Sequence, residues 1–194
     1  TRLVLSTEDK EILNISQNLG CEVIKRPNSL ARDDTPMISV VRHALEIVEA
    51  KDQRYDYVFV LQPTTPFRQS KDINEAVELI IKTGADSVIG VVRIYDNHPA
   101  RVKKIENNRL VPYCVEEDEE ARRQDLPPAY LRNGAVYVVK REIIETGSLR
   151  GTFQCPYIMP PERSVNIDDE LDFLLAEAVL NKFVSSKKLM GKSN

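Results

Sequence analysis

The sequence predicts a Rossmann-like α/β protein, in which helices cover both faces of a mostly parallel sheet to give three layers, α/β/α. The first observation is a set of unbroken apolar runs of strand length, at residues 3–5, 57–61 and 87–92. Such runs are typical of strands buried on both faces. The second observation is that the segments between these runs carry apolar residues at helical spacing. Strands that alternate with amphipathic helices favour a parallel sheet.

Length and composition agree with one soluble domain. The chain has 194 residues, 42% of them hydrophobic, and its 27 basic and 30 acidic side chains give a net charge of −3. Such a chain can bury a core of its own, and its charge balance argues against a disordered protein or a dedicated nucleic-acid binder. No apolar run approaches the roughly 20 residues of a membrane span, and no signal-peptide pattern opens the chain. We therefore expect a cytoplasmic protein that binds neither nucleic acid nor a membrane.

Cysteine and histidine residues indicate no metal or redox site. Cys21, Cys114 and Cys155 are odd in number, far apart and without a C-x-x-C pair. His43 and His98 are the only histidines and lie far from each other in sequence. Neither a disulfide framework nor a zinc site is expected from this spacing.

The first part of the chain predicts two strand–helix pairs. Residues 3–5 predict a strand, Ser6–Asp9 the start of a helix, and Gly20 the end of that helix. A second strand is expected at residues 22–24 and a second helix after Pro36. Each helix carries one apolar stripe: Ile12, Leu13, Ile15 and Leu19 in the first, and Val40, Val41, Ala44, Leu45 and Val48 in the second.

The same alternation continues to the end of the chain. Further strands are expected at residues 57–61, 87–92 and 135–139. Ser70 is the expected cap of a helix between the first two of these strands. A last helix follows Asp168 and carries an apolar stripe of Leu171, Leu174, Leu175, Ala178 and Val179. We expect residues 185–194 to form a frayed tail.

One insertion, residues 94–132, interrupts the alternation of strands and helices. It contains a basic patch at residues 101–104, a turn at Asn107-Asn108 and an acidic run at residues 116–120. The acidic run is typical of a solvated face. An insertion of this kind either folds over a site as a lid or reaches to a partner subunit, and composition does not separate the two.

Polar residues follow the apolar strands, at the edge of a parallel sheet where ligands bind. Ser6–Asp9, Arg26, residues 62–68 and Arg93 each come directly after a predicted strand. Arginine side chains match phosphate and carboxylate groups, while amides and hydroxyls can bind a sugar or a base. The alternative to a binding role is that Pro63 and Pro66 only make the loop of residues 62–68 rigid and that the Arg68 side chain is solvated.

Asn166 and Asp168 form a second candidate site. If residues 164–169 are extended, both side chains lie on one face, and their oxygens suit a hard cation such as Mg²⁺. The alternative makes Asp168 a plain N-cap of the last helix. Residues 132–134 predict a polar turn before a buried strand.

Four motifs together carry a family resemblance. They are Arg26-Pro27-x-x-Leu30-Ala31 with Asp33, Gln62-Pro63-Thr64-Thr65-Pro66-Phe67-Arg68, Asn133-Gly134-Ala135-Val136-Tyr137, and Glu162-Arg163-Ser164-Val165-Asn166-Ile167-Asp168 with Asp172-Phe173. In this order, over nearly the whole chain, the sequence resembles the acylneuraminate cytidylyltransferases. These are the CMP-sialic acid synthetases and their relatives for legionaminic and pseudaminic acids.

The resemblance implies a fold of the nucleotide-diphospho-sugar transferase type and a Mg²⁺-dependent reaction. The anomeric hydroxyl of a nine-carbon 2-keto sugar acid would attack the α-phosphorus of CTP, so that CMP is transferred and pyrophosphate leaves. The implied roles are metal binding for Asp168 and Asn166, nucleotide binding for Arg26, Arg68 and Asn133, sugar binding for Gln62, Arg101, Arg123 and Tyr137, and catalysis for Asp168, Arg123 and Gln62. The resemblance also makes the insertion at residues 94–132 an arm that forms a homodimer.

The sequence departs from the family pattern at two places. The family opens with a strand and a phosphate-binding loop of the type R-x-x-S-K-x-x-x-K-N, whereas this chain begins after it, at Thr1. We therefore expect residues 1–194 to be an N-terminally truncated cytidylyltransferase domain. Asn166 stands where the family usually has a second aspartate, so metal binding depends more on Asp168.

Two other functions stay open. A chain without the phosphate loop could be a catalytically silent dimer that binds nucleotide or sugar. A cytidylyltransferase for 3-deoxy-octulosonate is the other alternative, although the motifs at Asn133-Gly134-Ala135 and Arg163-Ser164-Val165 favour a nine-carbon acid. The sequence does not specify which acid is used.

Overall fold

The computed structural model of the chain describes residues 1–51, 53–114 and 122–190. Its strands are β1 (Val4–Thr7), β2 (Glu22–Lys25), β3 (Tyr57–Val60), β4 (Ser87–Ile94), β5 (Lys103–Glu106), β6 (Arg109–Pro112), β7 (Ala129–Lys140) and β8 (Gln154–Ile158). Its helices are α1 (Lys10–Asn18), α2 (Met37–Glu49), α3 (Ser70–Thr83), α4 (Arg141–Glu145) and α5 (Glu170–Met190). Four short 3-10 helices complete it: η1 (Asn28–Leu30), η2 (Pro99–Arg101), η3 (Arg123–Asp125) and η4 (Pro161–Arg163).

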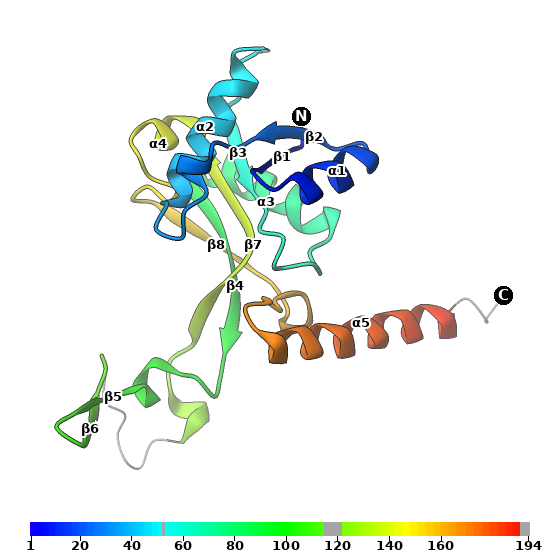
Figure 1. Cartoon of the computed structure of the whole chain (residues 1–194). Helices are drawn as coiled ribbons and strands as arrows, with labels where there is room; N and C mark the ends of the chain where they lie inside the picture. The colour runs from blue at the N-terminus through cyan, green and yellow to red at the C-terminus, as the bar shows by residue number, and fades with distance from the viewer. Residues whose placement is uncertain (52, 115–121, 191–194) are drawn as a thin grey trace.

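The central sheet is mixed, which corrects the expectation of a mostly parallel sheet. Its order is β3-β7-β4-β8, and β7 runs antiparallel to both of its neighbours. The reason is that β4 leads out into the insertion and β7 returns from it, so the two strands pair as a ribbon (Figure 1). β8 is parallel to β4, and β1 and β2 form a separate parallel pair.

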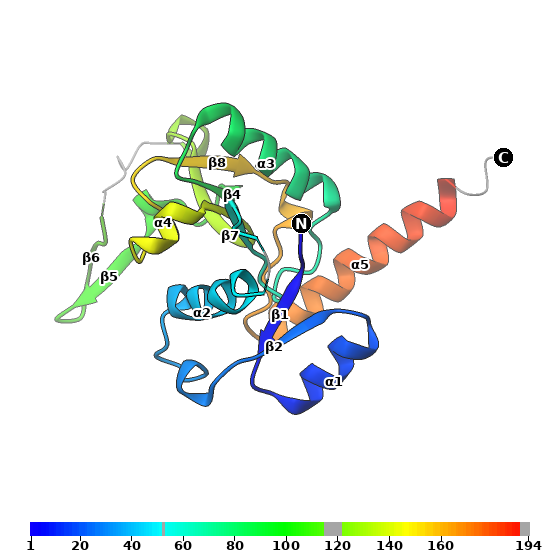
Figure 2. The same cartoon turned by 90° about the horizontal axis from the view of Figure 1, so that it is seen from above.

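Helices lie on both faces of the central sheet, as Figure 2 shows for α3 and α2. Ala76 and Ile80 of α3 pack against one face, in a cluster with Val138. The next residue of β7, Val139, points to the opposite face and packs with Val41 of α2 and with α4. This alternation follows the two-residue period of a strand and explains why β7 reads as a continuous apolar run.

A large bulge interrupts β7 where it crosses the sheet. Ile89 of β4 lies opposite Tyr137, but Val91, only two residues further, lies opposite Arg132. Four residues, 133–136, therefore separate two positions of β7 that face nearly the same place on β4. Bulges of this kind redirect side chains next to a site.

The insertion is an arm that extends away from the sheet (Figure 1). The β4–β7 ribbon forms its base as far as the pair Ile94 and Ala129, and a β5–β6 hairpin lies towards its end. The expected turn at Asn107 and Asn108 is confirmed, because both residues have positive φ, as a two-residue hairpin turn requires. The predicted acidic run at residues 116–120 lies outside the described residues.

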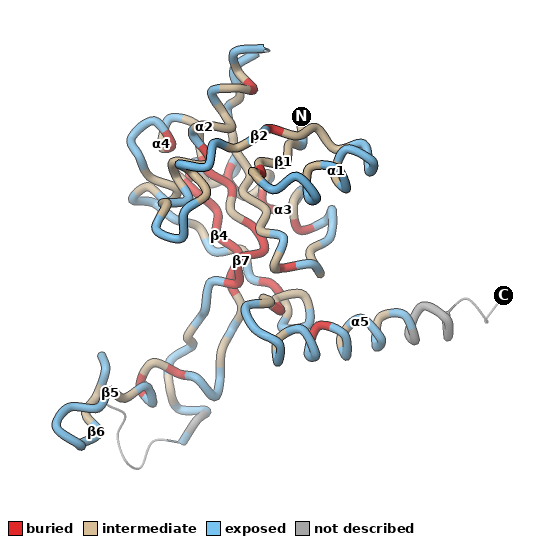
Figure 3. Tube along the Cα trace, in the orientation of Figure 1, coloured by how far each residue is buried: buried red, intermediate tan, exposed pale blue. Residues whose placement is uncertain are grey.

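Three helices differ from the sequence expectation. The apolar stripes of α1 and α5 are largely exposed, with Leu19 at 81% and Leu171 at 73%, because neither helix lies on the central sheet (Figure 3). Gln69, rather than Ser70, caps α3, in a capping box with Asp72. Helix α5 continues to Met190, so the tail expected to fray from residue 185 begins inside it. Within the described residues, no helix is long and apolar enough to cross a membrane.

Candidate functional site

The loop of residues 62–68, called the site loop here, follows β3 and is fixed beneath β7. The Arg68 guanidinium donates hydrogen bonds to the Ala135 carbonyl at 2.8 Å, to Thr65 Oγ1 at 3.1 Å and to the Gln62 carbonyl at 2.5 Å. Thr65 is fully buried between the loop and the bulge. Burial lowers the pKa of Arg68. The structure thus gives Arg68 a positioning role, and its expected contact with the nucleotide stays a prediction.

The bulge of β7 is held by Asn133, which is buried and has partners at both ends of its amide. Its Nδ2 donates to Ser164 Oγ at 2.9 Å, and its Oδ1 accepts from the Ala135 N–H at 3.1 Å. These bonds link the bulge to the segment that carries Asn166. The structure therefore shows a positioning role for Asn133 also, and nucleotide binding by this residue stays a prediction.

Gly134 allows the site loop and the bulge to meet. It has φ +73°, and a Cβ built on it would lie 2.5 Å from Gln62 Oε1. A side chain here would displace the Gln62 amide and strain the backbone as well. Only glycine lets this amide lie against the bulge.

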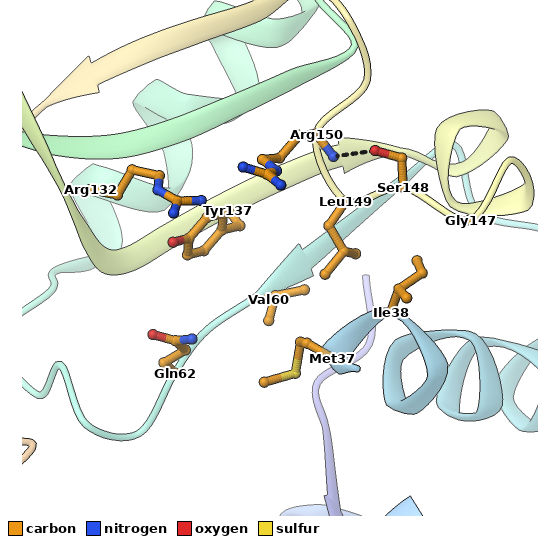
Figure 4. A pocket seen from close by; sticks show the side chains of 10 residues that line it. All are labelled: Met37, Ile38, Val60, Gln62, Arg132, Tyr137, Gly147, Ser148, Leu149 and Arg150. Atoms are coloured by element: carbon orange, nitrogen blue, oxygen red, sulfur yellow. Dashed lines mark hydrogen bonds between the residues drawn. The ribbon is translucent and has the colours of Figure 1, made fainter. Parts of the chain in front are cut away.

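A pocket of about 340 Å³ opens beside the bulge (Figure 4). Its size is within the range of small-molecule sites. Polar groups come from Gln62 of the site loop and from Arg132 and Tyr137, at the two ends of the bulge. The remaining lining residues are Met37, Ile38, Val60, Gly147, Ser148, Leu149 and Arg150. Among the described residues that line it none is acidic, so the pocket suits a ligand with negatively charged oxygens.

Asn166 and Asp168 lie next to the site loop. Thr64 Oγ1 donates to Asn166 Oδ1 at 2.8 Å, and the Thr64 carbonyl accepts from the Ile167 N–H at 2.9 Å. Asn166 Nδ2 in turn donates to the exposed carboxylate of Asp168. The two side chains therefore share one face, as the extended reading of this segment predicted.

The N-cap of α5 is Asp169 and not Asp168. Asp169 Oδ1 accepts from the Asp172 N–H at 2.9 Å, whereas Asp168 uses its own N–H to donate to Asp172. The plain N-cap alternative for Asp168 is therefore wrong, and its carboxylate is available to a ligand.

The oxygen atoms of Asn166 and Asp168 fit a magnesium ion whose remaining ligands are water and the phosphates of a bound substrate. Within the described ranges, no three His, Cys, Asp or Glu side chains converge on a common point. Mg²⁺ commonly binds through one or two carboxylates and completes its shell with water and substrate phosphates. One carboxylate and one amide oxygen meet this minimum, although Asn166 Oδ1 already accepts from Thr64.

Arg26 lies at the end of β2 and is paired with Glu8, at the end of β1. Its Nε is 2.8 Å from Glu8 Oε2, and a second nitrogen contacts the same oxygen. This hydrogen bonding holds the pKa of Glu8 below its ordinary value. Arg26 does not line the pocket, so the structure does not bring it together with Gln62.

Arg101 and Arg123 belong to the arm, in η2 and η3, and Arg101 does not line the pocket of its own chain. Of the predicted sugar-binding residues whose side chains the structure describes, Gln62 and Tyr137 lie together in the pocket and Arg101 does not. The residues that sequence reasoning missed are Arg150 and the apolar lining. Arg132 was noted only as part of a turn.

Comparison with known proteins decides the family. Residues 1–159 match the protein family described as Cytidylyltransferase. The chain belongs to this family. The match covers β1 to β8 and thus the central sheet, the pocket and the arm.

Several cytidylyltransferases are similar to the chain in sequence. N-acylneuraminate cytidylyltransferase A of Danio rerio is 33% identical over 187 residues, which cover 92% of this chain and 41% of that protein. The CMP-N,N'-diacetyllegionaminic acid synthase of Legionella pneumophila is 30% identical over 183 residues, covering 92% of this chain and 77% of that one. The chain thus spans less than half the length of the fish protein.

Solved structures support the fold. A CMP:2-keto-3-deoxy-manno-octonic acid synthetase in complex with CTP superposes with a TM-score of 0.63 at 13% identity, covering 94% of this chain and 81% of that one. A 4-diphosphocytidyl-2C-methyl-D-erythritol synthase from Anaerococcus prevotii gives 0.60 at 14%, covering 93% and 81%. At these identities the likeness is one of fold.

Proposed function

We propose that the protein transfers CMP from CTP to the anomeric hydroxyl of a nonulosonic, sialic-type acid and releases pyrophosphate. One observation carries this proposal: the site loop serves two sites at once. Gln62 lines the pocket, and Thr64, two residues later, binds Asn166 beside Asp168. A sugar in the pocket and a cation at Asp168 would therefore lie on adjoining residues of one fixed loop, as in-line phosphoryl transfer needs.

Each residue then has a stated task. Gln62 and Tyr137 bind the sugar, and Arg26 contacts the nucleotide from the end of β2. Arg68 and Asn133 hold the site loop and the bulge in position. Asp168, with Asn166, would hold Mg²⁺, which neutralises phosphate charge and assists loss of the hydroxyl proton.

Arg101 and Arg123 fit this scheme in a homodimer. Both belong to 3-10 helices of the arm, and Arg101 does not line the pocket of its own chain. We propose that the arm reaches the partner subunit and presents these arginines to the acid bound there. The names of the relatives from Danio rerio and Legionella pneumophila support a nine-carbon acid as substrate.

A catalytically silent binding protein is the second candidate. The observation that favours it is the single carboxylate at the cation site, where Asn166 adds no negative charge and its oxygen is already used by Thr64. Such a protein would bind CTP or the acid and turn neither over.

The test is pyrophosphate release by the full-length protein with CTP and Mg²⁺. N-acetylneuraminic, legionaminic and pseudaminic acids are offered in parallel with 3-deoxy-octulosonate. The proposal predicts release with at least one nine-carbon acid. Release with the octulosonate alone would make that acid the substrate, and release with none would leave the silent binding protein as the better account.

A further inference from the structure

Two arginines of the pocket point toward one another. Arg132 comes from β7, at the base of the arm, and Arg150 from the loop between α4 and β8. Figure 4 shows both guanidinium groups directed over the ring of Tyr137. Within the part of the chain that the structure describes, neither guanidinium has a hydrogen-bond or ion-pair partner.

The fold fixes the backbone of both arginines. Arg132 pairs with Val91 in the sheet. The Arg150 carbonyl accepts from Ser87 Oγ at 2.6 Å, and its N–H donates to Ser148 Oγ at 3.1 Å. Ser87 is fully buried in β4. The approach of the two side chains is thus a property of the sheet and its connecting loop.

Two like charges directed at one place repel, and the described residues of the pocket lining include no carboxylate that compensates them. A bound anion would remove this repulsion and accept hydrogen bonds from both guanidinium forks. The carboxylate of a sugar acid and the phosphates of CTP share this chemistry.

The surroundings of the pair favour the acid. Gln62 and Tyr137 offer single polar groups suited to hydroxyls, and the other side of the pocket is apolar. That apolar side consists of Met37, Ile38, Val60 and Leu149. A polyphosphate would gain nothing from such a surface, whereas a methyl-bearing substituent of a sugar would be buried against it.

We propose that Arg132 and Arg150 form a clamp for the carboxylate of the acid substrate, with Met37, Ile38 and Leu149 receiving an apolar substituent of the same molecule. This inference rests on the proposed function and names its acid-binding residues. The clamp would make the chain select acids whose carboxylate and apolar group are spaced to reach both sides of the pocket.

The test compares Arg132→Gln, Arg150→Gln and the double variant with Arg42→Gln, an exposed arginine of α2 that does not line the pocket. KM is measured separately for the acid and for CTP. Each clamp variant should raise KM for the acid about tenfold or more, since charged hydrogen bonds are lost, and leave KM for CTP within about twofold. Arg150→Lys keeps the positive charge, so it should raise KM for the acid less than Arg150→Gln does. An unchanged KM for the acid in the double variant, or a rise confined to KM for CTP, would overturn the clamp.

Calorimetric titration separates failure of the clamp from failure of the proposed function. The four acids used as substrates, and their methyl esters, are titrated into the protein without CTP. A chain that releases no pyrophosphate but binds an acid, prefers it to its ester and loses that preference in the double variant supports the clamp without the reaction. Binding that does not distinguish acid from ester, or no binding of any acid, would contradict the clamp.

Discussion

Gln62 is held in position by Arg68 and Gly134, neither of which lines the pocket. Its carbonyl is held by Arg68, and its side-chain amide lies against Gly134. Gly134 in turn occupies a left-handed conformation that is costly for any other residue. At the scale of residues, the site therefore depends on the close approach of two backbones as much as on its polar groups.

Gly134→Ala tests that close approach. The added Cβ would meet Gln62 Oε1 at 2.5 Å in addition to the cost of the positive φ. We expect a loss of about 2–4 kcal/mol in the free energy of unfolding, measured with urea, and a raised KM for the acid. Gly84→Ala is the matched control, because Gly84 has φ +65° with nothing within 4 Å. It should cost only about 1 kcal/mol, and equal losses in both variants would contradict the role of the contact.

Asp168 and Asp169 are neighbours with different tasks. Asp168→Ala should lower kcat about a thousandfold or more while leaving the unfolding free energy nearly unchanged, because its carboxylate would be lost as a metal ligand. Asp169→Ala should do the reverse, since it removes the N-cap of α5, at a cost of about 1 kcal/mol in stability. Steady-state kinetics and urea denaturation measure both. Full activity of Asp168→Ala would contradict the metal assignment.

The sequence motifs identify site residues that lie within one loop or one strand. Gln62 and Tyr137 were predicted as sugar contacts, and both line the pocket. Arg150 has no such signal, because its place in the pocket depends on a loop that is anchored by Ser87, far away in the sequence. The roles of Arg68 and Asn133 as anchors are equally invisible in sequence, since they follow from hydrogen bonds to backbone groups and to Ser164.

At the scale of elements, β7 decides both the sheet and the site. Its apolar run was predicted from sequence, but its direction was not, because an unbroken apolar run indicates a strand covered on both faces and says nothing about which way the strand runs. The arm makes β7 the return strand of a ribbon and therefore antiparallel to β4. The same strand carries the bulge that separates Arg132 from Tyr137.

One carboxylate, that of Asp86 just before β4, binds the residues that lead into β8, in addition to the backbone pairing of the two strands. Asp86 Oδ2 accepts from the N–H groups of Thr152 and Phe153 at 2.8 and 2.9 Å, and from the Thr152 hydroxyl. These bonds hold the pKa of Asp86 below its ordinary value of 3.8, and those from the N–H groups of Phe153 and Thr152 contribute most. The carboxylate form therefore contributes stability above that pH, and the contribution is lost as the pH falls through the lowered pKa.

Asp86→Asn tests this pH dependence. The variant should be less stable than the unaltered chain near neutral pH, and the difference should shrink as the pH falls below about 4. Urea denaturation across this range measures it. Asp33→Asn, at an exposed carboxylate, controls for the loss of one negative charge. A difference that stays constant with pH would show that the hydrogen bonds of Asp86 do not depend on its charge.

At the scale of the whole molecule, exposed apolar side chains occur on the arm and on α5, which both extend away from the central sheet. Ile105 and Leu110 lie directly opposite each other in the β5–β6 hairpin and are 75% and 73% exposed. Leu171, Leu174 and Leu175 of α5 are also exposed. The helix itself was predicted, but the stripe does not face a core, since a sequence pattern does not say whether a covering surface exists within the same chain.

The arm gives a prediction about assembly. We expect the protein to be a dimer by light scattering at micromolar concentration, and Ile105→Ser with Leu110→Ser to make it a monomer of unchanged circular dichroism. The monomer should lose activity, because Arg101 and Arg123 would no longer reach a partner's pocket. Leu19→Ser, which removes an exposed leucine of the body, is the control. An unaltered protein that is a monomer and fully active would contradict the role of the arm.

The most direct test of the central claim is a mass spectrum of the product formed from CTP, Mg²⁺ and a nine-carbon sugar acid. The account predicts a product whose mass is that of the acid joined to CMP with loss of water, formed together with one equivalent of pyrophosphate. Recovery of unchanged acid and CTP, or release of inorganic phosphate without a CMP conjugate, would contradict it.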